Sequence, residues 1–131
     1  MVVTPLYAGL LALWFLVLSY RVVGGRRQGV SLGDGGSESM LRLIRGQANF
    51  AEYVPLILLL MALLELGGFP HLWLHALGVT LLVARLLHGY AFGFTQRWMF
   101  GRFWGTALTF ALLLVCGLLN LYQFAHGPLS P

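Results

Sequence analysis

Four long uncharged segments, of which three approach or exceed the length of a membrane span, constrain this chain more than any other feature of its sequence. Residues 1–20 carry no charged side chain, and neither do residues 53–64, 66–84 and 103–125. A helix needs about 20 apolar residues to cross a hydrocarbon core about 30 Å thick. Only 9% of the 131 residues are charged, whereas roughly a quarter are charged in a soluble domain. The sequence therefore predicts an integral membrane protein with the lipid bilayer as a partner.

Proline, serine and glycine positions divide the chain into four predicted helices. Pro5 suits a first helical turn, where its missing N–H is harmless, and Ser37 or Ser39 can cap a second helix. Residues 67–70 read Gly-Gly-Phe-Pro, which stops one helix and starts the next. Short loops between spans favour an antiparallel bundle. We expect an all-α, four-helix membrane bundle, a single domain over residues 1–131, with helices at about 3–23, 38–66, 70–92 and 102–125.

Arginine residues mark one side of this bundle. Every basic residue is an arginine, and all except Arg85 surround the first and third connections: Arg21, Arg26, Arg27, Arg42, Arg45, Arg97 and Arg102. By the positive-inside rule, these two loops face the cytoplasm and both termini lie outside. The net charge of +4 does not indicate nucleic-acid binding, because no dense basic tract or nucleic-acid motif accompanies it.

A polar stripe leads directly into the second apolar segment. Residues 45–55 read Arg-Gly-Gln-Ala-Asn-Phe-Ala-Glu-Tyr-Val-Pro. On an α-helix Arg45, Asn49 and Glu52 fall at about 0°, 40° and −20°, so they share one narrow face. A carboxylate at the edge of a bilayer costs energy unless it has a partner or a task.

Counting residues from the membrane boundary suggests a partner for Glu52. Both Glu52 and Arg85 lie roughly 7 Å inside the arginine-rich boundary, and pairing is the usual solution for such charges. Glu52 and Arg85 could form a purely structural ion pair that neutralises both charges and holds two helices together. We favour a ligand site, because further polar residues share this layer: Arg45, Gln47, Asn49, His88, Tyr90 and Arg102.

Other reactive residue types offer weaker signals. His71 and His75 have a spacing that can bind metal on a helix, but an interfacial role is the simpler reading, and we expect no metal site. Cys116 lies in an apolar helix without a basic neighbour, which favours packing over nucleophilic chemistry. Glu65 is expected to be a solvated charge at a helix end.

The stripe resembles a known signature. Arg45-x-x-x-Asn49-x-x-Glu52-Tyr53-x-Pro55 is similar to the second-helix motif of the MAPEG superfamily, the membrane-associated proteins in eicosanoid and glutathione metabolism. Residues 84–90 resemble the arginine segment of the family's third helix, and residues 33–36 with 102–105 resemble small bacterial members. The resemblance covers nearly the whole chain. It implies a homotrimer in a bacterial inner membrane, with glutathione bound between subunits at the cytoplasmic side.

The resemblance also implies roles for residues of the second helix. Arg45 and Asn49 would contact glutathione, and Glu52 would hold its amino group. Gln47 and Tyr53 occupy motif positions that line the site in some members.

On the third helix, Arg85 belongs to the matching segment, and His88 falls where some members have a ligand-contacting His or Tyr. Phe92 stands where a further Tyr is expected, and Tyr90 is a nearby substitute.

Thiol activation is the chemistry that this resemblance implies. Glutathione has a thiol pKa of roughly 8.5, so a nearby guanidinium is needed to favour the thiolate at neutral pH. Family members use an arginine at the start of the fourth helix. Arg102, which precedes Gly105, is the candidate and Arg97 the alternative.

Three functions remain open at this point. The first is a glutathione transferase or peroxidase that acts on hydrophobic small molecules. The second is a non-enzymatic lipid- or small-molecule-binding protein of the same fold. The third is a small multidrug transporter, which is disfavoured because residues 1–20 lack the acidic residue that such exporters use.

Overall fold

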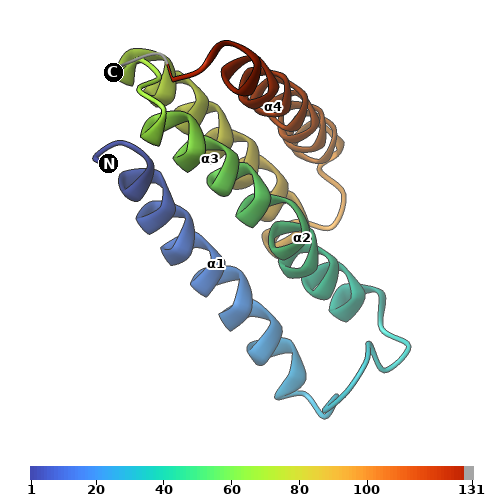
Figure 1. The fold of residues 1–131 in the computed structure, drawn as a ribbon. Helices are drawn as coiled ribbons and strands as arrows, with labels where there is room; N and C mark the ends of the chain where they lie inside the picture. The colour runs from blue at the N-terminus through green and yellow to red at the C-terminus, as the bar shows by residue number, and fades with distance from the viewer. Residues whose placement is uncertain (129–131) are drawn as a thin grey trace.

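The computed structural model describes residues 1–128 and contains four helices (Figure 1). They are α1 (Thr4–Arg26), α2 (Glu38–Leu66), α3 (His71–Phe94) and α4 (Met99–His126). Each has the length and hydropathy of a membrane span. No strand occurs within the described residues, so the predicted all-α membrane bundle is confirmed.

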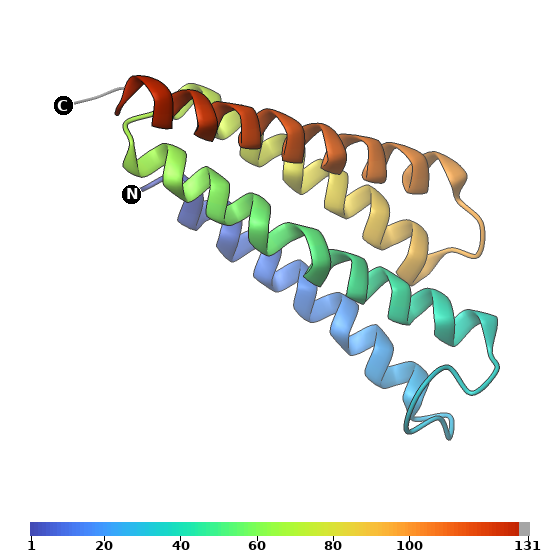
Figure 2. The same ribbon diagram turned by 45° about the vertical axis from the view of Figure 1, so that its right-hand side comes forward.

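The helices run antiparallel, and α2 and α3 form the centre of the bundle (Figures 1 and 2). α1 packs on α2 and α3, and α4 packs on the same two helices, whereas within residues 1–128 α1 and α4 do not contact each other. The start of α1, the end of α4 and the 67–70 turn lie at one end, and the other two connections lie at the opposite end (Figure 2). We call the second end the arginine end, because it carries Arg21, Arg26, Arg27, Arg42, Arg45, Arg97 and Arg102.

Buried leucine, isoleucine and methionine side chains fill the centre, and many exposed side chains are also apolar. An apolar outer surface is expected where lipid replaces water. Small residues let helices approach closely in a membrane. At Gly105 of α4, a Cβ atom would lie 2.6 Å from the Cβ of His88 and 2.9 Å from the carbonyl oxygen of Ala84. The α3–α4 contact therefore depends on this glycine.

Two helix boundaries at the arginine end differ from the sequence prediction. α1 continues to Arg26, and α4 begins at Met99 rather than near residue 102. The Arg102 N–H donates to the carbonyl oxygen of Trp98, which closes the first turn of α4. Arg102 consequently lies one turn inside α4 instead of opening it.

Glu65 is buried, so the expectation of a solvated charge is wrong. Its carboxylate accepts backbone hydrogen bonds from Val2 (3.1 Å), Val3 (2.6 Å) and Thr4 (3.0 Å). The first N–H groups of a helix have no partner within that helix, and they favour a negative charge. Glu65 therefore caps α1 from the end of α2.

Candidate functional site

Arg85 is the centre of a buried polar network between α2, α3 and α4. Its side chain is fully buried. The Nη1 of Arg85 donates a hydrogen bond to the Oδ1 of Asn49 at 2.8 Å and lies 3.4 Å from the Oγ1 of Thr109. The Nη2 of Arg85 lies 3.5 Å from the Nδ1 of His88. A buried charge is costly unless hydrogen bonds compensate it, so this network fixes the three helices and the orientation of Asn49.

Glu52 does not pair with Arg85, which corrects the sequence-based prediction. The Oε1 of Glu52 instead lies 3.5 Å from the Nη1 of Arg45 in an ion pair whose side chains are 50% and 49% exposed. The reason is direction around the helix: Asn49 turns toward α3, whereas Arg45 and Glu52 face outward. Equal depth in the membrane does not place two side chains on facing surfaces.

Two other predicted site residues point elsewhere. The Nε2 of Gln47 donates to the Oγ of Ser19 on α1 at 3.0 Å, away from the Arg45–Glu52 pair. Tyr90 lies on the far side of α3, where its ring stacks on Phe94 with centroids 5.4 Å apart. Within one protomer the structure does not bring either residue to the outward face of α2.

Phe92 links His88 to Arg102. The rings of His88 and Phe92 stack with centroids 4.5 Å apart, and the guanidinium carbon of Arg102 lies 4.3 Å from the centroid of Phe92. The Nη2 of Arg102 also lies 3.4 Å from the carbonyl oxygen of Gln96. Phe92 thus holds the Arg102 guanidinium by a cation–π contact, at the position where the resemblance expects a tyrosine.

Arg102 borders two hollows of different character. One, of about 290 Å³, is polar and is also lined by Glu38, Arg42, Gln96 and Arg97. The other, of about 450 Å³, is apolar and is also lined by Phe103, Thr106 and Phe110. Arg97 reaches only the polar hollow.

Tyr53 adjoins the apolar hollow, because its ring lies 5.5 Å from the ring of Phe110.

Metal-ligating groups do not gather in the described part of the chain: no cluster of three His, Cys, Asp or Glu side chains occurs there. His75 instead shares a 2.8 Å hydrogen bond with the hydroxyl of Tyr7. Cys116 is buried in the core.

Sequence reasoning missed Thr109 and the bridging role of Phe92. Thr109 follows Arg102 by seven residues and Gly105 by four, a spacing that places all three on one face of a helix. This spacing is visible in the sequence and could have placed Thr109 beside the predicted site. The position of Phe92 between His88 and Arg102 depends on how α3 and α4 pack, and no local pattern reveals it.

Comparisons with known proteins agree with this architecture. The MAPEG family model matches residues 4–122. The chain is 38% identical over 121 residues to "Inner membrane protein YecN" of Escherichia coli strain K12, and equally to the protein of that name from Escherichia coli O6:H1. These matches cover 92% of this chain and 91% of each relative. No solved structure matches significantly. The chain is an integral inner membrane protein, and it belongs to the MAPEG family.

Proposed function

We propose that this protein is a membrane-bound glutathione transferase or peroxidase. In this proposal, glutathione binds at the arginine end, on the cytoplasmic side, between neighbouring subunits of a homotrimer. Arg102 stabilises the thiolate, which then attacks lipophilic electrophiles.

The position of Arg102 between a polar and an apolar hollow is the observation that carries the proposal. A thiolate held by this guanidinium would have a charged tripeptide on one side and a lipid-soluble partner on the other. The two hollows, of about 290 and 450 Å³, are close to or within the range of about 300–1,000 Å³ that is usual for ligand pockets. Arg102, rather than Arg97, borders both hollows.

The exposed Arg45–Glu52 pair supports binding of a ligand with both signs of charge. Glutathione carries two carboxylates and one ammonium group. An exposed ion pair contributes only about 0–1 kcal/mol, so a ligand can replace it at small cost with two intermolecular contacts. Arg45 would then bind a carboxylate and Glu52 the ammonium group, beside an Asn49 that Arg85 already orients.

The open face around this pair supports a site completed by another subunit. Arg45 and Glu52 remain half exposed in one protomer. Gln47 and Tyr90 point to other surfaces of the same protomer. A neighbouring subunit could cover the Arg45–Glu52 pair and place its own Gln47 or Tyr90 beside it.

Phe92 favours one alternative, a non-enzymatic binding protein of the same fold. Its ring covers the Arg102 guanidinium, and a backbone carbonyl takes one of the guanidinium donors. Fewer donors then remain for a thiolate, while the apolar hollow is still available to a lipid or a small molecule.

Ultraviolet difference absorbance of the detergent-solubilised protein with glutathione tests binding and activation together. A guanidinium within 4–6 Å lowers the pKa of an acid by about 1–3 units, so Arg102→Gln should reduce the thiolate signal at neutral pH at least about tenfold. Arg97→Gln is the matched control and should retain it. Glutathione binding without any thiolate signal in the wild type would favour the non-enzymatic alternative.

Substitution of Glu52 separates binding from stability. Because Glu52 is exposed and pairs only with Arg45, Glu52→Ala should change the free energy of unfolding by no more than about 1 kcal/mol. It should nevertheless weaken glutathione binding, measured by isothermal titration calorimetry, by about tenfold or more, since a charged hydrogen bond contributes about 1.5–3 kcal/mol. Unchanged affinity would remove Glu52 from the site.

A further inference from the structure

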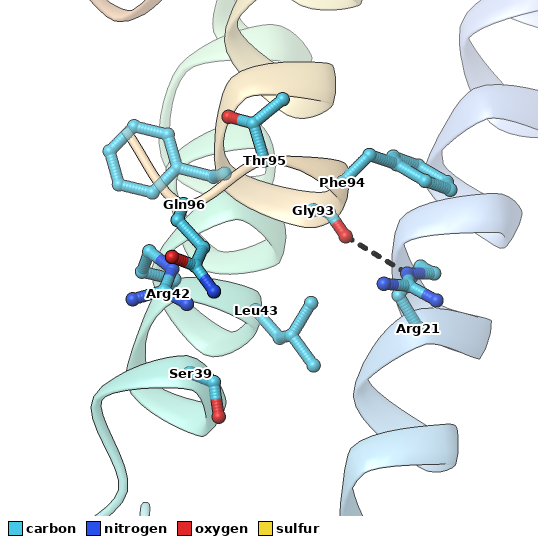
Figure 3. A pocket seen from close by; sticks show the side chains of 9 residues that line it. Arg21, Ser39, Arg42, Leu43, Gly93, Phe94, Thr95 and Gln96 are labelled. Carbon is cyan, nitrogen blue, oxygen red and sulfur yellow. Dashed lines mark hydrogen bonds between the residues drawn. The ribbon is translucent and has the colours of Figure 1, made fainter. Parts of the chain in front are cut away.

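A separate cavity lies at the arginine end between α1, the start of α2 and the end of α3. Its volume is about 180 Å³. The polar side chains around it are Arg21, Ser39, Arg42, Thr95 and Gln96 (Figure 3). Arg42 and Gln96 line both this cavity and the polar hollow beside Arg102, whereas Arg45, Glu52 and Arg102 do not line this cavity. The cavity therefore adjoins the polar hollow but contains none of the residues that the glutathione proposal assigns to ligand contacts.

Arg21 is held at the edge of this cavity by its neighbours on α3. Its Nε donates to the carbonyl oxygen of Gly93 at 2.9 Å, as the dashed line in Figure 3 shows. Its guanidinium carbon lies 4.6 Å from the ring centroid of Phe94. Within residues 1–128 the two terminal nitrogens of Arg21 make no hydrogen bond, so they are available for a ligand. A guanidinium that is oriented in advance loses less entropy when it binds.

Arg42 and Gln96 lie across the cavity from Arg21 (Figure 3). Within residues 1–128 the Arg42 guanidinium has neither a carboxylate partner nor a hydrogen bond. Ser39 adds a hydroxyl, which shares a 2.9 Å hydrogen bond with the Ser37 hydroxyl. The described lining contains two guanidinium groups and no acidic side chain, which is a charge pattern that binds an anion.

The size of the cavity restricts that anion. Pockets for whole small molecules usually measure about 300–1,000 Å³, and this cavity measures about 180 Å³. One anionic group fits inside, and the remainder of the ligand must lie outside. Apolar surface adjoins the cavity, because Phe94, which lines it, is 42% exposed, and Val17, one helical turn before Arg21 on α1, is 39% exposed.

We propose that this cavity binds the phosphate group of an anionic phospholipid. Arg21 and Arg42 contact the phosphate oxygens from opposite sides, and the acyl chains lie along the apolar surface of α1 and α3. Basic pockets between membrane helices recognise anionic headgroups in this way. A free anion would gain nothing from the exposed apolar side chains, which is why a lipid fits better than soluble phosphate.

Native mass spectrometry of the full chain, released from detergent micelles that contain phosphatidylglycerol or phosphatidylcholine, tests the proposal. The wild type should retain phosphatidylglycerol preferentially. Arg42→Gln should weaken this retention about fivefold, equivalent to about 1 kcal/mol for one interfacial arginine. Ser39→Glu, which keeps both arginines but places a negative charge in the cavity, should weaken it at least as much.

Arg27→Gln is the matched control, because Arg27 is exposed at the same end but lies outside the cavity. Its retention of phosphatidylglycerol should equal that of the wild type. An equal loss in Arg27→Gln would show a diffuse electrostatic attraction and overturn the proposal. Displacement of the lipid by millimolar inorganic phosphate would assign the cavity to a soluble anion, and displacement by glutathione would assign it to the glutathione site; either result would also overturn it.

Discussion

The cap that Glu65 provides for α1 leads to a quantitative prediction about stability. Glu65→Gln replaces one carboxylate oxygen by an NH2 group, which cannot accept a hydrogen bond. The two hydrogen bonds from Val3 and Thr4 are buried and the one from Val2 is partly buried. At least one buried N–H therefore loses its acceptor.

The expected loss follows from two contributions. A buried donor without a partner costs about 1–3 kcal/mol, and removal of a negative charge from a helix N-terminus costs about 0.3–1 kcal/mol. Together they predict that Glu65→Gln lowers the free energy of unfolding by about 1.3–4 kcal/mol. For a chain of this size the midpoint of thermal unfolding should fall by about 4–15 °C.

Tryptophan fluorescence during heating in detergent measures this change, and hydrogen exchange of peptides from the first turn of α1 locates it. Glu52→Gln is the matched control, because Glu52 lies on the same helix but is half exposed. It should change stability by no more than about 1 kcal/mol. Equal melting midpoints for the two variants, with unchanged exchange at Val3 and Thr4, would refute the capping role.

Two further predictions concern the packing of α3 against its neighbours. Asn49→Leu removes the 2.8 Å acceptor of Arg85 and should destabilise the protein by about 1.5–3 kcal/mol in chemical denaturation, because a buried charged group loses a hydrogen bond. Gly105→Ala places a Cβ 2.9 Å from a backbone oxygen and should cost about 1–3 kcal/mol. Gly117→Ala, on the same helix with no atom within 4 Å of the added Cβ, should be neutral or slightly stabilising; equal melting temperatures for these two variants would contradict the proposed close approach.

The sequence was sufficient to predict the four helices, because their apolar lengths and their turn residues are local signals. The start of α4 was the exception. Gly101 and Arg102 resemble a helix start, but the chain is already helical at Met99. A Cβ at Gly101 would lie 2.8 Å from the carbonyl oxygen of Leu87, so this glycine serves the packing of α4 on α3.

The candidate site was predicted less completely, for a geometric reason. Residue counting gives the depth of Glu52 and Arg85 but not the direction in which each side chain points. Arg85 donates a hydrogen bond to Asn49, which precedes Glu52 by about one turn of α2. Glu65 illustrates the same limit, because its partners lie more than 60 positions earlier in the chain and meet it only after folding.

The lack of contact between α1 and α4 has a thermodynamic consequence. Both helices rest on α2 and α3 but, in the described chain, not on each other. Substitutions at distant sites without shared partners usually add in free energy. A lipid bound beside α1 and a ligand bound beside α4 should thus influence each other only through the α2–α3 pair and through Arg42 and Gln96, which line both cavities. A nonzero interaction energy in a double-mutant cycle would report on these shared elements and not on a direct α1–α4 contact.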